Sequence, residues 1–158
     1  MEILWPETYK PGNTAVHVRN ELQMPGLELE RVWEWLCRCD LWPSWYPNSA
    51  NIHVKNQSDS SLRLCTEFRW NTFGVTIDSR VLEFVRYERL AWDAHCNGVH
   101  AYHAWALERS DGGVYVLTEE TQNGWLARLG SLAMPNRMHR WHQRWLEGLR
   151  QQGQTGTP

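Results

Sequence analysis

Lysine is scarce in this chain of 158 residues: it occurs only as Lys10 and Lys55, and the arginines are scattered along the sequence. The formal net charge is −2, whereas a protein that binds nucleic acid through its phosphates needs a basic surplus. The same shortage argues against a polybasic membrane anchor. We therefore expect no nucleic-acid partner.

Long apolar runs are also missing, since no stretch approaches the roughly 20 apolar residues that span a bilayer. The first seven residues are acidic and interrupted by Pro6, unlike a secretory signal. The few cysteines lack the spacing of a zinc site, and free thiols suit a reducing compartment; they are Cys37, Cys39, Cys65 and Cys96. We expect a cytoplasmic protein without stable membrane insertion.

Several catalytic signatures are absent as well. The chain has no glycine-rich phosphate loop and no Gly-x-Ser-x-Gly sequence, which argues against nucleotide chemistry and serine hydrolysis. His139 and His142 share a helical face at three-residue spacing, but sequence spacing fixes no third ligand. We interpret His139, Arg140 and Arg144 as a solvated basic face. We predict no metal site and no cofactor.

What the chain has in excess is tryptophan, with eleven residues. Each indole buries on the order of 150–250 Å² and needs a partner for its N–H group. Some of these side chains must thicken the core, line a pocket or stay partly exposed. For any one tryptophan, the sequence leaves the choice open.

Hydrophobic periodicity predicts a strand over 14–24, a helix over 26–38 and a short second helix within 40–47. Alternation then predicts six more strands, at 50–55, 62–70, 75–81, 90–95, 99–107 and 114–120. A final helix should cover 126–150, and Pro135 should kink or split it. Both faces of the seventh strand carry apolar residues, so its inward side stays undecided.

These elements predict an α+β fold: about seven antiparallel strands in a strongly curved sheet, wrapped on a long C-terminal helix, with two short helices between strands one and two. We expect an irregular N-terminal arm over residues 1–13, a single domain over 14–152 and a disordered tail over 153–158. The arm can pack across its own domain or a neighbour's, which leaves a homodimer open.

Matching stretches run in a characteristic order through most of residues 14–150. They are Met24-Pro25, Val32-Trp33, Leu36, Trp42-Pro43, Trp45, Phe68, Trp70, Ser79, Val81, Glu83, Leu90-Ala91-Trp92, His103, Trp105, Gly112-Gly113, Thr118-Glu119-Glu120, Gly124 and the C-terminal helix. In this order the chain resembles the START-like, Bet v 1-like (SRPBCC) superfamily and its polyketide cyclase/dehydratase-like group. The resemblance implies a helix-grip fold with a cavity between the sheet and the last helix.

Inward-facing positions then predict the cavity lining. The apolar members are Phe68, Trp70, Ile77, Val81, Trp92, Trp105, Leu129, Met134 and Met138, and the polar members are Asn20, Thr66, Ser79 and Thr118. His103 and Glu120 are the candidate catalytic pair, because an imidazole in an apolar wall can act as an acid or base near neutral pH. Alternatively, His103 is a core histidine satisfied by a backbone carbonyl or by Glu120.

Three functions remain in view. The first is binding of a small hydrophobic molecule, aromatic, polyketide-like or lipid-like, in the cavity. The second is a cyclase or dehydratase acting on such a molecule through proximity and acid–base catalysis. The third is a protein-interaction module of the chaperone-activator type, using the charged outer sheet face; the candidate residues there are Arg63, Glu67, Arg69, Asp78 and Arg80.

Overall fold

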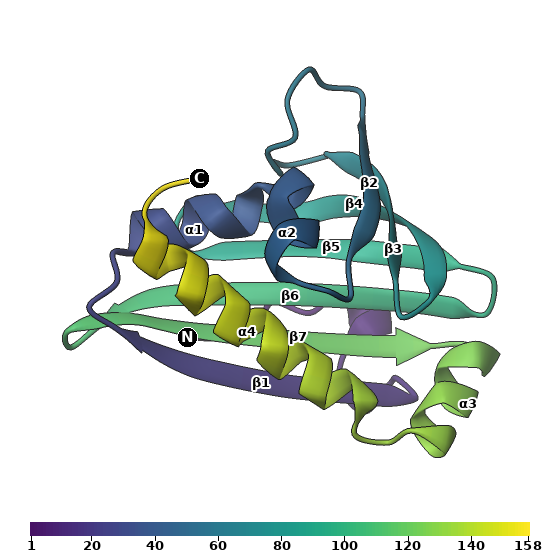
Figure 1. Ribbon diagram of the computed structural model, residues 1–158. Coiled ribbons are helices and arrows are strands. Elements are labelled where there is room, and N and C mark those ends of the chain that lie inside the picture. The colour runs from purple at the N-terminus through teal and green to yellow at the C-terminus, as the bar shows by residue number, and fades with distance from the viewer.

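The computed structural model describes residues 1–158 and contains one seven-stranded antiparallel sheet with the helices gathered mainly on one side (Figure 1). The strands are β1 (Val16–Pro25), β2 (Ala50–Lys55), β3 (Glu67–Thr72), β4 (Val75–Val85), β5 (Arg89–Cys96), β6 (Val99–Ser110) and β7 (Gly113–Asn123). The helices are α1 (Leu29–Cys37), α2 (Trp42–Trp45), α3 (Trp125–Ala133) and α4 (Arg137–Thr155), with 3-10 turns at Glu7–Tyr9 and Cys39–Leu41. The predicted helix-grip fold is confirmed.

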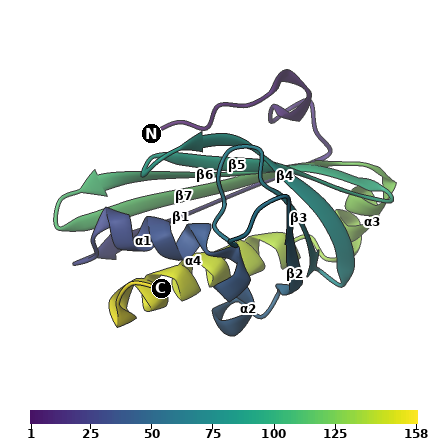
Figure 2. The same cartoon turned by 90° about the horizontal axis from the view of Figure 1, so that it is seen from above.

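The sheet order is β1-β7-β6-β5-β4-β3-β2, so the first and the last strand of the chain are neighbours. Hairpins join β3 through β7, and every pair is antiparallel. Helix α4 crosses the inner face, and α1 lies beside it (Figures 1 and 2).

Helix α1 forms where the sequence repeats apolar residues every three or four positions. Leu29, Val32 and Leu36 are all buried, and Glu30 lies in the first turn, where a carboxylate favours the helix dipole. The chain enters the helix through Gly26, whose φ of +73° suits glycine. The helix therefore begins three residues later than the predicted start at residue 26.

The strand predicted over 62–70 is shorter in the structure, because β3 begins only at Glu67. Residues 62–66 form a loop in which Cys65 has a φ of +65°. Leu62 is buried and its N–H bonds to Cys37 O, whereas Leu64 is 56% exposed. The alternation of leucines in this segment reflects one anchoring contact with α1 and not a pleated strand.

Pro135 was predicted to kink or to split the C-terminal helix, and in the structure it splits the helix into α3 and α4. Proline lacks the backbone N–H that a continuous helix would use, and α3 ends at Ala133. The second helix runs farther than expected, to Thr155. Figure 1 shows α3 set apart at the end of the sheet, away from the axis of α4.

The C-terminal residues predicted to form a disordered tail over 153–158 are partly anchored. Gly153 is buried close to Leu27, and its carbonyl accepts a hydrogen bond from Arg31 Nη1 at 3.3 Å. Trp35 Nε1 donates to Gly156 O at 2.7 Å. Helix α1 therefore holds the end of α4, which the composition of this segment did not indicate.

The N-terminal arm packs across the outer face of its own sheet, opposite α1 and α4 (Figure 2). Ile3 is buried, and Trp5 and Tyr9 contact the ring of Tyr102 at centroid distances of 5.7 and 5.4 Å. This outer aromatic cluster, made by Ile3, Trp5, Tyr9 and Tyr102, rests on Leu117 of β7. It explains why β6 and β7 are apolar on both faces.

The inward side of β7 is the one that carries Val114, Val116, Thr118 and Glu120. Leu117 belongs instead to the outer cluster. Elsewhere on the outer face, Asp78 binds both Arg69 and Lys55, so part of the charged surface is neutralised within the chain. None of the helices combines the length and the hydropathy needed to cross a bilayer.

Candidate functional site

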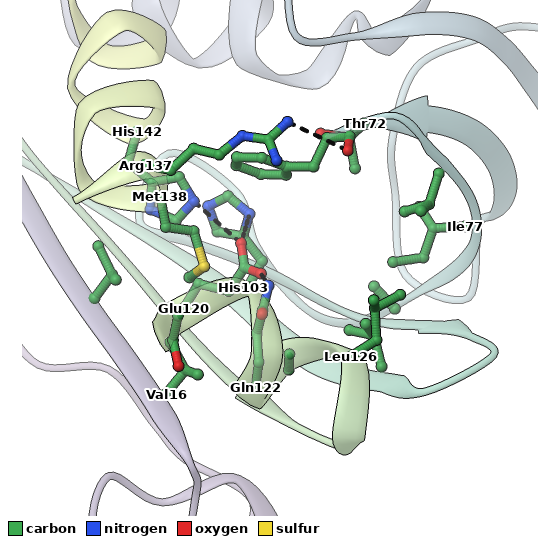
Figure 3. Close-up of a pocket in the computed structure, with 18 of the residues that line it drawn as sticks. Val16, Thr72, Ile77, His103, Glu120, Gln122, Leu126, Arg137, Met138 and His142 are labelled. Atoms are coloured by element: carbon green, nitrogen blue, oxygen red, sulfur yellow. Dashed lines mark hydrogen bonds and ion pairs between the residues drawn. The ribbon is translucent and has the colours of Figure 1, made fainter. Parts of the chain in front are cut away.

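A cavity of about 260 Å³ lies between the sheet and the two C-terminal helices (Figure 3). The inward faces of β1 and of β3 through β7 form its floor. Helix α3, the connection around Pro135 and the first half of α4 cover it. Fourteen of its 23 lining residues are hydrophobic, so a ligand here would meet a mainly apolar wall.

One row of residues across four strands carries the polar part of this wall. Trp92 pairs with His103, His103 with Glu120, and Glu120 with Val18 in the strand register. Since side chains alternate between the faces of a sheet, all four point to the inner side. The antiparallel register therefore places an imidazole and a carboxylate beside each other from two different strands.

Helix α4 adds a second imidazole to this pair. His103 Nδ1 and His142 Nε2 each lie 3.1 Å from the same carboxylate oxygen, Glu120 Oε2. The two rings are stacked, with centroids 4.7 Å apart and planes inclined by 18°. We call His103, Glu120 and His142 the His–Glu–His cluster; Figure 3 shows the three side chains converging beside the cavity.

Two further side chains hold this cluster in place. Thr118 Oγ1 lies 2.8 Å from His103 Nε2, so the second nitrogen of that imidazole is also hydrogen-bonded. Gln122 Nε2 donates to the other carboxylate oxygen, Glu120 Oε1, at 2.6 Å. By contrast, His142 Nδ1 is buried and has no partner within the protein. One polar atom of the cluster is therefore unsatisfied.

Burial and hydrogen bonding act in opposite directions on the charges of the cluster. Burial lowers the pKa of His103 to about 4, although Glu120 favours its protonated form. Burial by itself would raise the pKa of Glu120, but the hydrogen bonds with His103 and His142 hold that pKa well below its ordinary value. At neutral pH the site therefore contains an ionised carboxylate beside a neutral His103 imidazole.

Aromatic rings surround the cluster on the side of the core. Trp145 stands edge-on to His103, Trp105 and Trp42 at centroid distances of 5.2, 5.2 and 5.0 Å, and it stacks on Tyr46 at 4.3 Å. Such contacts fix the orientation of each ring. The indole N–H of Trp145, which also lines the cavity, has no hydrogen-bond partner within the protein.

No protein-family model and no curated protein matches the sequence. Among solved structures, the crystal structure of hypothetical protein jhp0584 from Helicobacter pylori is 36% identical to this chain, with a TM-score of 0.89. The alignment covers 94% of each chain. The two proteins belong to one family. Because that protein is described only as hypothetical, membership in its family does not assign a reaction.

More distant structures extend the likeness of fold. The protein TTHA0849 from Thermus thermophilus has a TM-score of 0.70 at 15% identity, over 89% of this chain and 98% of that chain. The di-domain ARO/CYC StfQ from the steffimycin biosynthetic pathway has a TM-score of 0.69 at 12% identity, over 89% of this chain and 52% of that chain. The family of jhp0584 thus has a polyketide cyclase-like fold, and this chain spans about half of StfQ.

Seven of the residues predicted for the site line the cavity: Trp70, Ile77, Trp92, His103, Glu120, Met134 and Met138. Alternation along the strands placed the first five on the inner face. The two methionines lie on either side of the break at Pro135. The candidate pair His103 and Glu120 is thus brought together at the cavity wall.

Four other predicted residues are buried in the core or held in a loop and do not line the cavity. Phe68, Val81 and Trp105 are buried in the main core, against other apolar side chains. Thr66 lies in the loop before β3, where its hydroxyl accepts from Arg63 N and donates to Gln57 Oε1. The alternation predicted which strand residues point inward, but it could not predict that the core packed against α1 and α2 is filled and that the cavity lies only beneath α3 and α4.

The remaining four predicted residues also lie outside the cavity lining: three form hydrogen bonds elsewhere and one is exposed. Asn20 Nδ2 donates to His139 O and Gln143 Oε1, which ties β1 to α4. Ser79 accepts the indole N–H of Trp70 at 3.1 Å. Thr118 lies behind His103, as described above. Leu129 is 56% exposed, because α3 turns Leu126 and Ala127 towards the cavity instead.

His142 is the main site residue that sequence analysis missed. Its neighbours His139 and Arg140 are exposed, as expected for a solvated face, but His142 is 1% exposed. The helical stripe contained the signal, since His142 follows Met138 by four residues and precedes Trp145 by three. Arg137 was missed as well; it lines the cavity, bonds to Phe73 O and has no carboxylate partner.

Proposed function

We propose that this protein binds a small, mainly hydrophobic molecule in the cavity beneath α3 and α4, with a polar group of that molecule directed at the His–Glu–His cluster. The main observation in support of this proposal is that the cavity combines an apolar wall with a single polar cluster, which is the usual composition of a ligand site. Burial of apolar surface would supply most of the affinity. The cluster and nearby donors would supply orientation.

The size of the cavity favours a compact ligand within the aromatic, polyketide-like and lipid-like classes. An apolar cavity of about 150 Å³ holds benzene, whereas drug-sized ligands occupy about 300–1,000 Å³. The 260 Å³ available here therefore fits a molecule of about one or two rings. A long acyl chain would extend past the cavity, so we favour an aromatic ligand over a lipid.

Two groups near the cavity favour a ligand that carries a hydrogen-bond acceptor. The buried indole N–H of Trp145 is unpartnered, and a buried donor without an acceptor costs about 1–3 kcal/mol. Arg137 lies over the ring of Phe73 at 5.3 Å without an acidic partner. A carbonyl, phenolate or carboxylate oxygen on the ligand would complement either group.

A second candidate function is an enzyme of the cyclase or dehydratase type. The observation that favours it is the pairing of His103 and His142 with Glu120 at the cavity wall, because His142 Nδ1 has no partner within the protein and an oriented imidazole with a free nitrogen can exchange a proton with a bound substrate. The fold shared with the di-domain ARO/CYC StfQ is compatible with this proposal. The carrier and the enzyme would therefore bind the same kind of molecule in the same cavity.

The binding proposal is tested by tryptophan fluorescence and native mass spectrometry with a panel of one- and two-ring aromatic compounds and fatty acids. We expect saturable binding of a ring compound at one molecule per chain. Ala127→Leu places a larger side chain in the cavity and should weaken binding at least tenfold. Ala133→Leu is the matched control, because Ala133 is exposed on the same helix.

Equal loss of affinity in both leucine variants, or no binding by any panel member, would contradict the cavity proposal. The enzymatic alternative is tested separately by incubation with a linear polyketide-like substrate and analysis of the products. Turnover that disappears in His103→Ala, while binding of the substrate persists, would identify an enzyme. Binding without turnover would identify a carrier.

A further inference from the structure

We propose that His103, Glu120 and His142 together bind one divalent transition-metal ion, of the Zn²⁺ or Fe²⁺ class, at the wall of the cavity. The three ligand atoms come from β6, β7 and α4 and lie within 4.8 Å of one another. Both imidazole nitrogens lie 3.1 Å from Glu120 Oε2. Metal–ligand bonds of about 2.0–2.2 Å place neighbouring donors about 3.0–3.5 Å apart, so these two separations already suit a shared ion.

The charge of the cluster supports a cation at this position. The Glu120 side chain is only 10% exposed, and histidines are its only basic partners. Removing an ionised carboxylate from water costs several kcal/mol unless a nearby opposite charge compensates it. Hydrogen bonds from neighbouring side chains satisfy its oxygens, but no arginine or lysine is paired with it to offset its charge. A divalent ion between the three side chains would compensate that charge.

The surrounding hydrogen bonds resemble those that orient metal ligands. A ligating imidazole usually donates its other N–H to a neighbouring group, and a ligating carboxylate is itself hydrogen-bonded. Thr118 lies 2.8 Å from the second nitrogen of His103, and Gln122 donates to the second oxygen of Glu120. The threonine hydroxyl can donate or accept, so it suits both the metal-free and the metal-bound tautomer of His103.

The position of the cluster leaves room for a ligand on the ion. All three residues line the cavity, so further coordination positions would face the space in which the small molecule is proposed to bind. Two imidazoles and one carboxylate with open positions are typical of zinc and non-haem iron sites that bind a substrate or water. The ion would then hold an oxygen of the bound molecule.

The test is titration of the metal-free protein with Co²⁺, followed by visible absorption, and competition by Zn²⁺ measured by calorimetry. We expect one Co²⁺ per chain, with d–d bands and no thiolate charge-transfer band. Glu120→Gln and His142→Asn should each weaken binding at least 100-fold. Glu119→Gln, on the outer face of the same strand, and His139→Asn, on the exposed side of the same helix, should leave binding unchanged.

Absence of a stoichiometric Co²⁺ spectrum would overturn the proposal, and so would undiminished binding by Glu120→Gln or His142→Asn variants whose circular dichroism shows a native fold. Using both variants keeps the test valid if one of them fails to fold. The test requires no organic ligand, and ligand binding can be measured in the presence of a chelator. Failure of the metal site and failure of the cavity proposal are thus distinguishable.

Discussion

Glu119 and Glu120 are neighbours in β7, yet they point to opposite faces of the sheet and meet different surroundings. Glu119 faces outward and binds His17 at 2.7 Å and Arg19 at 3.0 Å. Glu120 faces inward and binds only His103 and His142 among basic side chains. The His17 side chain is 36% exposed and that of Arg19 is 52% exposed, whereas His103 and His142 are at most 3% exposed.

This comparison shows that the residue types alone do not define the site. A histidine beside a glutamate occurs on both faces, but only on the inner face are both imidazoles desolvated and next to a cavity. On the outer face, Arg19 compensates the charge of Glu119, whose own side chain is as buried as that of Glu120. On the inner face no arginine or lysine reaches Glu120, so its charge is available to a bound ion or ligand.

The largest expected difference between the two faces concerns their aromatic clusters. Trp42 is fully buried on the inner side, and its ring contacts Phe68, Trp92 and Trp145. We expect Trp42→Ala to lower the free energy of unfolding by about 3–5 kcal/mol. Trp5→Ala, which removes a half-buried member of the outer aromatic cluster, should cost about 1–2 kcal/mol. Urea unfolding of both variants measures this, and equal losses would contradict the comparison.

The next difference concerns the two histidines that bind a glutamate. His142→Ala removes a fully buried ring and one partner of Glu120, so we expect a loss of about 2–3 kcal/mol. His17→Ala removes a half-exposed partner of Glu119 and should cost less than about 1 kcal/mol. Thermal unfolding at neutral pH compares the two. A larger loss for His17→Ala would show that the His17–Glu119 pair contributes more to stability than the His142–Glu120 pair.

The smallest expected effect is a pH dependence on the outer face. Hydrogen bonds from Arg69 and Lys55 lower the pKa of Asp78 to about 2. Since this pKa is lower in the folded than in the unfolded state, the stabilisation is present above about pH 4 and is lost as the pH falls through about 2. Asp78→Asn should therefore be slightly less stable than the wild type at pH 6 and equally stable below pH 2.

The control for this measurement is Glu2→Gln, since Glu2 is exposed and forms no ion pair in the structure. It should follow the wild-type curve at every pH. A difference between Asp78→Asn and the wild type that persists below pH 2 would show that the effect is not electrostatic.

Most of the fold could be predicted because its signals are local. The alternation of β1, β4, β5 and β6 and the three-to-four spacing of α1 each lie within one segment. The errors occurred where tertiary contacts override the local pattern. Leu62 is anchored by α1 and does not begin a strand, and α1 holds Gly153 and Gly156 at the end of α4.

The site could be predicted only in part, because its members come from distant segments. Strand alternation placed His103 and Glu120 on one face, but their pairing depends on the β6–β7 register. His142 joins them from α4, a helix that begins after the break at Pro135 and crosses the inner face of the sheet. The inner side of β7 was undecided because the arm covers its outer face with a second aromatic cluster.

The doubly covered strand β7 has a consequence for the fidelity of folding. A slip of one residue in its pairing would turn Glu119 inward and Glu120 outward, and it would exchange Leu117 for Val116 in the core. Each face would still receive apolar residues and one glutamate, so burial alone discriminates weakly between the two pairings. The correct pairing then depends on the Asp111-Gly112 turn, where Gly112 has a φ of +77° and Gly113 lies too close to Met24 for any larger side chain. We therefore expect a substitution in this turn to increase the fraction of misfolded chains, while chains that fold correctly keep the contacts of the site.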